Sequence, residues 1–306
     1  MITATKTLYL YVETPLHAGV GSGLSSIDLP IQRERTTQYP MIQGSGIKGK
    51  LRSVAEDTLP EEKVRIMFGP KTTDAADHAG ALIAGDARIL LFPVRSLSGV
   101  FAYTTSYDVL ARFKRDRERN DAALPWNIPA TVNSTPPETP VALVTSNSLV
   151  SASGAIVLEE FSFQAQQSKE VDDIADWIAR NAFPQAYEYW REKLRRSLII
   201  LSDNDFRDFV VNATEVITRI SIDRKTKTAA GTALWTEEHL PTDTLLYVPI
   251  YATDSRKAIS NGEKAIPAAE ILQDALSLEN SQGGYIQLGG DETVGRGLVR
   301  LHWESV

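Results

Sequence analysis

Apolar and polar residues alternate at several places along the chain, which is typical of β-strands. One face of the first alternating run carries Leu8, Leu10 and Val12, and the other carries Tyr9, Tyr11 and Glu13. Residues 6–13 are therefore predicted to form a half-buried strand. Residues 81–92 are strongly apolar, with breaks at Gly85 and Pro93, and indicate a buried strand pair or one long strand. Residues 215–223 and 244–252 are also predicted to be strands.

Apolar residues recur at helical spacing in other segments. The ranges predicted to be helical are 47–58, 107–120, 172–180, 185–201 and 266–276. Residues 122–153 contain five prolines, so we expect a loop or an insertion there. Helices and strands mix without a regular strand–helix–strand repeat. This arrangement favours an α+β fold built on an antiparallel sheet.

The last part of the chain, residues 283–301, is rich in glycine. Two alternating apolar runs, 285–288 and 298–301, flank the glycines, and the pattern predicts strand, turn and strand. Glycine allows positive φ and lets another backbone come close. With Arg296 inside it, the turn suits contact with a polyanion. A simple hairpin turn is the other interpretation of the same residues.

A second glycine-rich segment, residues 43–52, precedes a predicted helix. Free amides at a helix start, next to Lys48, Lys50 and Arg52, are suited to bind an anion. The segment nearly matches the phosphate loop of nucleotide hydrolases, but Leu51 stands where that loop needs a metal-binding hydroxyl. The glycines of residues 19–23 do not have the dinucleotide-binding spacing, and no predicted helix follows them. We therefore do not expect a nucleotide site.

An ordered set of segments resembles the RAMP superfamily of CRISPR systems, and most of all the repeated backbone subunit of the type III-B (Cmr) effector complex. The matching segments are 14–19, 27–34, 44–49, 219–229, 233–241 and the glycine-rich tail. The resemblance implies one RAMP domain over residues 1–306, with a ferredoxin-like (RRM-type) core and large insertions. Residues 116–195 are expected to be one insertion, and residues 219–241 a projecting thumb hairpin.

Composition agrees with such a protein. The chain has 306 residues, 42% of them hydrophobic and 23% charged, as in ordinary globular proteins. It has no cysteine, which excludes disulfides and thiolate chemistry. It has no long apolar run and no export signal, so we expect a cytoplasmic protein without membrane contact. The net charge of −7 argues against indiscriminate nucleic-acid binding. Local basic clusters, such as residues 48–52 and 224–227, would have to provide any RNA contact.

Asp28 is the candidate for the chemistry. An aspartate in a loop rich in glycine and serine is most often a turn or cap residue. The resemblance implies a different role, because the family carries at this position the aspartate needed for metal-dependent cleavage of target RNA. Such a carboxylate either holds a divalent ion, Mg²⁺ or Mn²⁺, against the scissile phosphate or positions the attacking hydroxyl. RNA supplies its own nucleophile, the 2′-OH, so a compact catalytic triad is not needed.

Three further residues are candidates for a catalytic role. His17 follows the first strand and is either a structural hydrogen-bonding residue or, because it is near a glycine run, a residue that contacts RNA or transfers a proton. Glu237 and Glu238 are either solvated acids on a hairpin or, as the resemblance implies, near a neighbouring subunit's cleavage site. We expect RNA contacts from one phosphate-binding surface. Its expected residues are Ser45, Lys48, Lys50, Arg52, Gly289, Gly290, Gly295 and Arg296.

Two functions follow from the resemblance. In the first, the chain binds CRISPR guide RNA, stacks head-to-tail with other copies and other Cmr subunits, and cuts complementary target RNA at regular intervals. In the second, it is a guide-RNA-binding backbone without cutting activity, as in relatives that lack the loop aspartate. The presence of Asp28 favours the first function.

Overall fold

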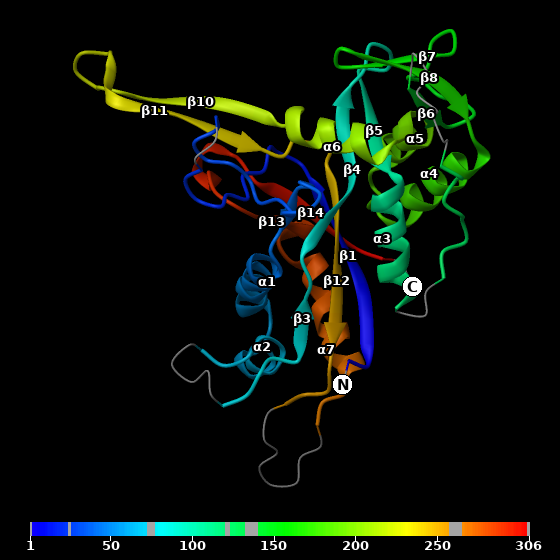
Figure 1. The fold of residues 1–306 in the computed structure, drawn as a ribbon. Coiled ribbons are helices and arrows are strands. Elements are labelled where there is room, and N and C mark those ends of the chain that lie inside the picture. Colours follow the sequence, from blue (N-terminus) through cyan, green and yellow to red (C-terminus); the bar gives the residue numbers. More distant parts are fainter. Residues whose placement is uncertain are drawn as a thin grey trace.

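The structure, a computed structural model, describes residues 2–23, 26–71, 77–119, 123–131, 140–256 and 265–304. Parts of the predicted proline-rich loop therefore lie outside the described residues. Twelve of the described strands form one sheet, and two more form a separate hairpin (Figure 1). Nearly all strand pairs are antiparallel. The predicted α+β class with a mostly antiparallel sheet is thus confirmed.

Four long strands form the centre of the sheet, in the order β14, β1, β12, β4. Their bounds are Ala4–Val12 for β1, Ala87–Arg95 for β4, Leu245–Ala252 for β12 and Leu298–Trp303 for β14. All three neighbouring pairs run antiparallel. The prediction that β1 is half-buried was wrong, because both faces are covered. Tyr9 packs near Phe113 and Tyr11 near Phe183, so the tyrosines are buried as fully as the leucines.

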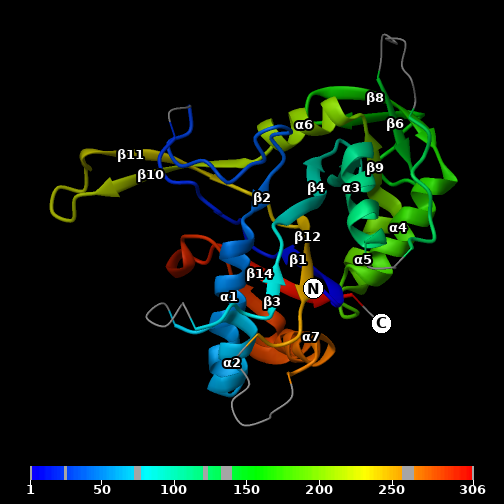
Figure 2. The same cartoon turned by 60° about the horizontal axis from the view of Figure 1, so that its bottom comes forward.

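The sheet continues beyond β4 into a second lobe, drawn mainly in green in Figures 1 and 2. The strand order there is β5, β9, β6, β8, β7. The bounds are Phe101–Ser106, Leu198–Leu201, Val141–Val144, Phe161–Gln167 and Ala155–Leu158, respectively. The pairs β5–β9 and β6–β8 are parallel. The predicted insertion, residues 116–195, supplies β6, β7 and β8 to this lobe.

Seven α-helices are described, and they cover the sheet. They are α1 Gly44–Thr58, α2 Glu61–Phe68, α3 Tyr107–Glu118, α4 Lys169–Asn181, α5 Glu188–Ser197, α6 Asp203–Asn212 and α7 Ala268–Ser277. The prediction that 185–201 is one helix was wrong at its end, because four consecutive buried apolar residues form β9 there. None of the described helices has the length and apolar character needed to cross a membrane.

Several short strands and 3₁₀ segments lie around α1 and the C-terminal glycines. They are β2 Met41–Ile42, β3 Leu82–Ala84, β13 Tyr285–Gln287 and two 3₁₀ segments, Leu278–Gly284 and Glu292–Val294. β13 pairs with β14, as the strand–turn–strand pattern predicts. β2 pairs with β4 and brings the chain directly into α1.

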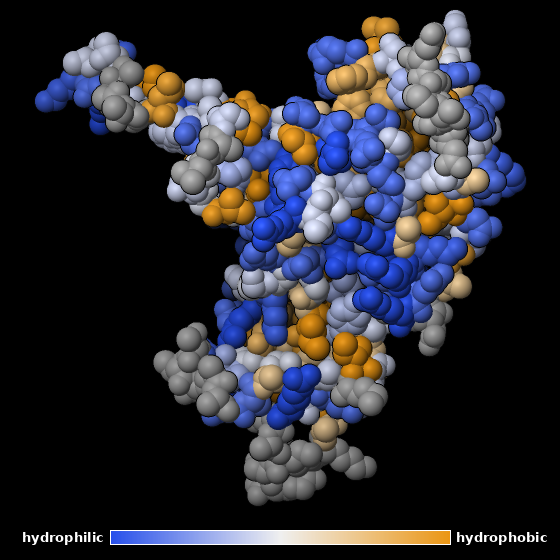
Figure 3. Space-filling model, in the orientation of Figure 1, coloured by the Kyte–Doolittle hydropathy of each residue, from blue (hydrophilic) through white to orange (hydrophobic). Residues whose placement is uncertain are grey.

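A hairpin projects from the body of the molecule (Figures 1 and 2). It consists of β10, Glu215–Ile222, and β11, Ala229–His239, close to the predicted 219–241. Figure 3 shows hydrophobic patches along its length. The large apolar side chains that are exposed on the hairpin are Val216, Ile220, Ile222 and Leu234. At the base of the hairpin, the end of β11 contacts the loop that follows β1, the loop that carries Asp28, and the C-terminal glycine-rich turn.

Candidate RNA-binding groove and catalytic loop

The structure brings the two glycine-rich segments together in a groove of about 530 Å³. One wall is α1, with Gly46, Gly49 and Lys50. The opposite wall is the C-terminal turn with Gly289 and Gly290, and His17 lies between the two walls. Four of the predicted functional residues thus share one surface, although about 240 residues separate the two segments in the chain. The glycines leave backbone rather than side chains along the groove, and one lysine supplies positive charge.

The backbone after β1 explains the position of His17. Leu16 and Leu240 exchange two backbone hydrogen bonds of 2.9 Å, so the chain runs along the end of β11. The Gly290 amide donates to the His17 carbonyl at 3.0 Å. Gly289 has φ +73°, and a Cβ there would lie 2.1 Å from the same carbonyl oxygen. This close approach requires glycine.

The His17 ring is oriented by one hydrogen bond. Its Nδ1 lies 2.7 Å from the backbone carbonyl of Glu238. A carbonyl oxygen only accepts, so Nδ1 carries the proton. In the neutral ring Nε2 is then a free base. Since His17 lines the groove, this nitrogen is in position to exchange a proton with a bound ligand.

Asp28 is exposed on a loop that pairs with β11. The Leu29 amide donates to the Thr236 carbonyl, and the Glu238 amide to the Leu29 carbonyl, each at 3.0 Å. Oδ2 of Asp28 accepts hydrogen bonds from the Thr236 amide at 2.8 Å and from its hydroxyl at 3.0 Å. These bonds, the backbone one first, lower the pKa of Asp28, so the carboxylate is ionised at neutral pH.

Asp28 and His17 are held by neighbouring positions of β11. Thr236 anchors the first and Glu238 the second, and two residues of a strand span about 7 Å. The strand therefore acts as a common support for the two candidate groups.

Glu238 is buried and accepts several hydrogen bonds. Arg33 Nη2 lies 2.5 Å from Oε1, the Ile31 amide lies 3.0 Å from Oε2, and the Thr214 hydroxyl donates at 2.8 Å. Its side chain is only 3% exposed. With these partners Glu238 holds the 27–33 segment against the hairpin. The expectation that it is a solvated acid was wrong.

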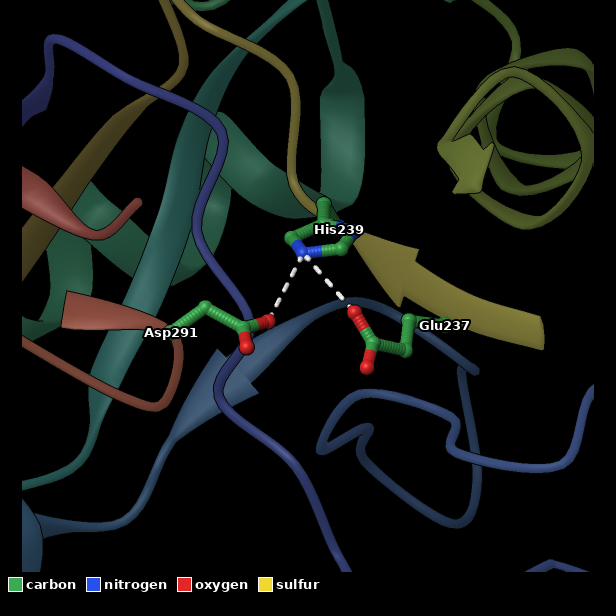
Figure 4. A group of neighbouring side chains, drawn as sticks. All are labelled: Glu237, His239 and Asp291. Atoms are coloured by element: carbon green, nitrogen blue, oxygen red, sulfur yellow. Dashed lines mark ion pairs between the residues drawn. The ribbon is translucent and has the colours of Figure 1, made fainter. Parts of the chain in front are cut away.

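Glu237 belongs to a different cluster, on the opposite face of β11. Figure 4 shows it with His239 and Asp291. Its Oε2 accepts from Arg219 Nε at 2.8 Å, and its Oε1 from the Trp235 indole at 2.7 Å. Burial opposes ionisation of Glu237, but the bonds from Trp235 and Arg219 outweigh it and lower the pKa. Glu237 is also buried rather than solvated.

The remaining predicted RNA-binding residues do not all line the groove. Arg52 lies in another cavity, where it pairs with Glu56 at 2.9 Å and donates to the Pro70 carbonyl. Lys48 is partly buried, and burial together with the charges of Arg256 and Arg52 lowers its pKa. Of the four cations expected on one phosphate-binding surface, Lys50 lines this groove.

The start of α1 also differs from the predicted free anion site. The helix begins at Gly44, three residues earlier than expected, and the Gly44 amide donates to the Asp86 carboxylate at 2.8 Å. One helix-start amide is therefore already bonded to a protein anion. Ser45 is exposed beside it. Gly295 is exposed in the C-terminal turn, and Arg296 lies near Glu215 and His239 at the base of the hairpin.

Comparison with known proteins decides the family. The family model of the RAMP superfamily matches residues 9–300. The chain belongs to the RAMP superfamily. The CRISPR system Cmr endoribonuclease Cmr4 of Pyrococcus furiosus is 38% identical over 300 residues, which cover 97% of this chain and 95% of that protein. The CRISPR system CMR subunit Cmr4 of Saccharolobus solfataricus is 26% identical, covering 98% and 97% of the two chains.

Solved structures of RAMP proteins have the same fold. Oligomeric Cmr4 from Pyrococcus furiosus superimposes with a TM-score of 0.74 at 32% identity and covers 99% of both chains. A chain of the type III-B Cmr-beta complex bound to cognate target RNA has a TM-score of 0.73 at 21% identity, covering 99% of this chain and 98% of that one, and it shows the shared fold alone. The resemblance found in the sequence is confirmed.

Sequence reasoning about this RAMP chain missed several residues of the site. Thr236 positions Asp28, Arg33 neutralises Glu238, and Asp291 approaches His239. Arg33 had a weak signal, as a basic residue within a matched segment. Thr236 and Asp291 had none, because each acts through a partner far away in the chain.

Proposed function

We propose that this chain is the repeated guide-RNA-binding subunit of a type III-B CRISPR complex and that it cuts complementary target RNA. The observation that carries the proposal is that Asp28 and His17, in two separate loops, are both hydrogen-bonded to β11, and that His17 lines a groove together with Lys50 and the glycine-rich turn. Relationship to a protein named as a Cmr endoribonuclease supports it.

The core of this subunit is of the ferredoxin-like type. The four central strands stand in the order β14, β1, β12, β4. The helix α1 falls between β1 and β4 in the chain, and α7 between β12 and β14. This is the strand–helix–strand–strand–helix–strand arrangement of that fold. Residues 116–195 are then an insertion between its second and third core strands, and the β10–β11 hairpin is the thumb.

Guide RNA lies in the groove between α1 and the C-terminal turn. Phosphates approach the backbone near Gly289, Gly290 and Gly49, and Lys50 supplies charge. Arg296 and Gly295 extend this contact toward the hairpin base. Each phosphate contact removed should reduce the slope of the log–log salt dependence by about 0.7 for single-stranded RNA. Lys50→Gln should therefore weaken guide binding and flatten its salt dependence.

Copies of the subunit stack head-to-tail along the guide, together with other Cmr subunits. The projecting hairpin carries exposed apolar residues, among them Ile220, Ile222 and Leu234 at 51–63% exposure, and a basic tip with Arg224. Such residues are suited to a contact with another surface. A head-to-tail contact that does not close makes a filament. A related protein is described as oligomeric.

Cutting needs a divalent ion, Mg²⁺ or Mn²⁺, and Asp28 fits one position in its coordination. The carboxylate is exposed and ionised, and both of its bonds from Thr236 go to Oδ2. A single protein carboxylate suits an ion such as Mg²⁺ that keeps several waters and takes further oxygens from a phosphate. When bound, the ion stabilises negative charge on the phosphate oxygens.

The chain's own residues then manage orientation and protons. His17 Nε2 accepts the proton of the RNA 2′-OH as its oxygen bonds to phosphorus. The P–O5′ bond breaks, and the departing O5′ takes a proton from water. The Glu238 carbonyl holds the ring in the required tautomer. Glu237 assists, if at all, from the other face of β11. A non-catalytic backbone subunit is the alternative function, and Asp28 argues against it.

The test is a reconstituted complex with guide RNA, complementary RNA and Mn²⁺. Asp28→Ala should abolish cutting and leave guide binding and assembly unchanged. A matched control is Asp172→Ala, because Asp172 likewise accepts from the amide and hydroxyl of one residue, Ser146, but lies on α4. It should cut normally. Chelation of the metal, or a 2′-deoxy substitution at the cut site, should also stop cutting. Wild-type rates with Asp28→Ala would refute the assignment.

A further inference from the structure

A buried imidazole and two carboxylates meet where the hairpin joins the body of the molecule. Glu237 and His239 lie on the same face of β11, and Asp291 comes from the C-terminal turn (Figure 4). His239 Nε2 is 3.5 Å from Asp291 Oδ2 and 4.0 Å from Glu237 Oε2. One ligand atom of each residue lies within 4.8 Å of the others.

His239 is not satisfied by the protein groups around it. Its side chain is fully buried, and neither ring nitrogen makes a hydrogen bond to the described part of the chain. A buried polar group without a partner is costly. Figure 4 shows its nitrogen directed toward both carboxylates, at separations too long for hydrogen bonds.

The spacing is close to that of a metal coordination shell. Ligand atoms about 2.1 Å from an ion in tetrahedral geometry lie about 3.4 Å from one another. The His239–Asp291 separation of 3.5 Å already has this value, whereas the Glu237 oxygen, 4.0 Å from His239 and bonded to Arg219, would have to move toward the ion. One nitrogen and two carboxylate oxygens suit Mn²⁺, Fe²⁺ or Zn²⁺ better than Mg²⁺, which prefers oxygen ligands only.

Arg219 is the competing cation at this cluster. Its Nε donates to Glu237 at 2.8 Å, but its Nη2 lies 3.3 Å from Asp291 without making a hydrogen bond. The guanidinium is therefore ion-paired with both carboxylates and hydrogen-bonded to Glu237. A bound ion would compete with Arg219 for Asp291 and would also give a partner to the His239 ring, which has none among the described residues.

We propose that Glu237, His239 and Asp291 form a transition-metal site, separate from Asp28, that joins the hairpin to the C-terminal turn. Asp28 bonds to Thr236, whose side chain is on the opposite face of β11. The turn that carries Asp291 also carries Gly289 and Gly290, which line the groove. The ion would therefore connect the base of the hairpin to the groove. This inference does not depend on the proposed function.

The site is tested on the purified full-length chain without RNA. The metal-free protein is titrated with Mn²⁺, and free ion is measured by electron paramagnetic resonance. We expect one Mn²⁺ bound per chain, with millimolar Mg²⁺ competing poorly. Pulsed resonance should detect coupling to a histidine nitrogen. Asp291→Asn and His239→Gln should each weaken binding at least about tenfold, and His239→Gln should lose the nitrogen coupling.

Asp172→Ala, on α4, is the matched control and should bind Mn²⁺ as the wild type does. Arg219→Gln should bind several-fold more tightly, since the competing cation is removed. Asp291 has φ +63°, which asparagine tolerates, so Asp291→Asn is expected to fold. It therefore tests the metal site even if the buried His239 variant does not fold. Absence of binding, absence of nitrogen coupling, or unchanged affinity in Asp291→Asn would overturn the proposal.

Discussion

Removal of the Glu238 carboxylate should unfold the protein at a lower temperature rather than merely slow its chemistry. Glu238→Ala leaves the Arg33 guanidinium, only 14% exposed, without its partner at 2.5 Å. It also leaves the buried Ile31 amide without an acceptor. Breaking a buried ion pair by removing one partner costs about 3–5 kcal/mol.

The shift in melting temperature follows from the size of the chain. With about 2.1 cal/mol/K per residue, the unfolding entropy of 306 residues is about 0.64 kcal/mol/K. A loss of about 4 kcal/mol therefore lowers Tm by about 6 °C. Differential scanning calorimetry of the isolated subunit measures this directly. Glu56→Ala is the control, because its pair with Arg52 is exposed and should be worth less than about 1 kcal/mol.

The double variant Arg33→Met with Glu238→Leu sharpens the prediction. Replacing both buried charges with apolar groups should recover most of the lost stability, because no unpaired charge is left. If Glu238→Ala has the same melting temperature as the wild type but cuts no RNA in the reconstituted complex, Glu238 acts in the chemistry and the structural assignment is refuted.

Two further predictions concern single sites. Gly289→Ala should lower stability by about 1–3 kcal/mol and reduce cutting, because its Cβ would collide with the His17 carbonyl; Gly154→Ala has similar φ strain but open space around it and should keep its activity. Burial raises the pKa of Asp243, so its ionised form destabilises the fold and stability falls as pH rises through that pKa. Asp243→Asn should raise Tm at pH 7–8 and lose this advantage in acid, and a pH series of melting curves showing no such difference would contradict the assignment.

Local patterns were enough to locate the strands and helices that form the core. The alternation around Leu8 located β1, and the run 244–252 located β12, because period and burial are properties of neighbouring residues. The lobe with residues 116–195 was not predicted in detail, since its strands pair with distant partners such as β9. Even there, the four consecutive apolar residues Leu198–Leu201 indicated a strand. The helical spacing of the residues before them led instead to the prediction of one continuous helix.

The candidate site was predictable only in part, for a related reason. Asp28 was found through family resemblance and His17 through its position near a glycine run, whereas their supports Thr236 and the Glu238 carbonyl lie more than 200 residues away in the chain. The proximity of Asp291 to His239 also depends on tertiary structure. Charge counts did not show that Arg52 turns to Glu56, because side-chain direction on a helix depends on the packing of that helix.

The strand β11 runs for 11 residues from the tip of the hairpin to His239, a length of about 36 Å. Leu234 on this strand is exposed, and the near end of the strand holds Asp28 through Thr236 and His17 through Glu238. Because the strand is anchored at its base and projects at its other end, a contact made at the tip of the hairpin changes the angle of the strand at its base. The alignment of the proposed catalytic loop is then sensitive to whatever contacts the hairpin, so an isolated subunit and one held within an array are expected to differ in activity although every residue of the proposed site is present in both.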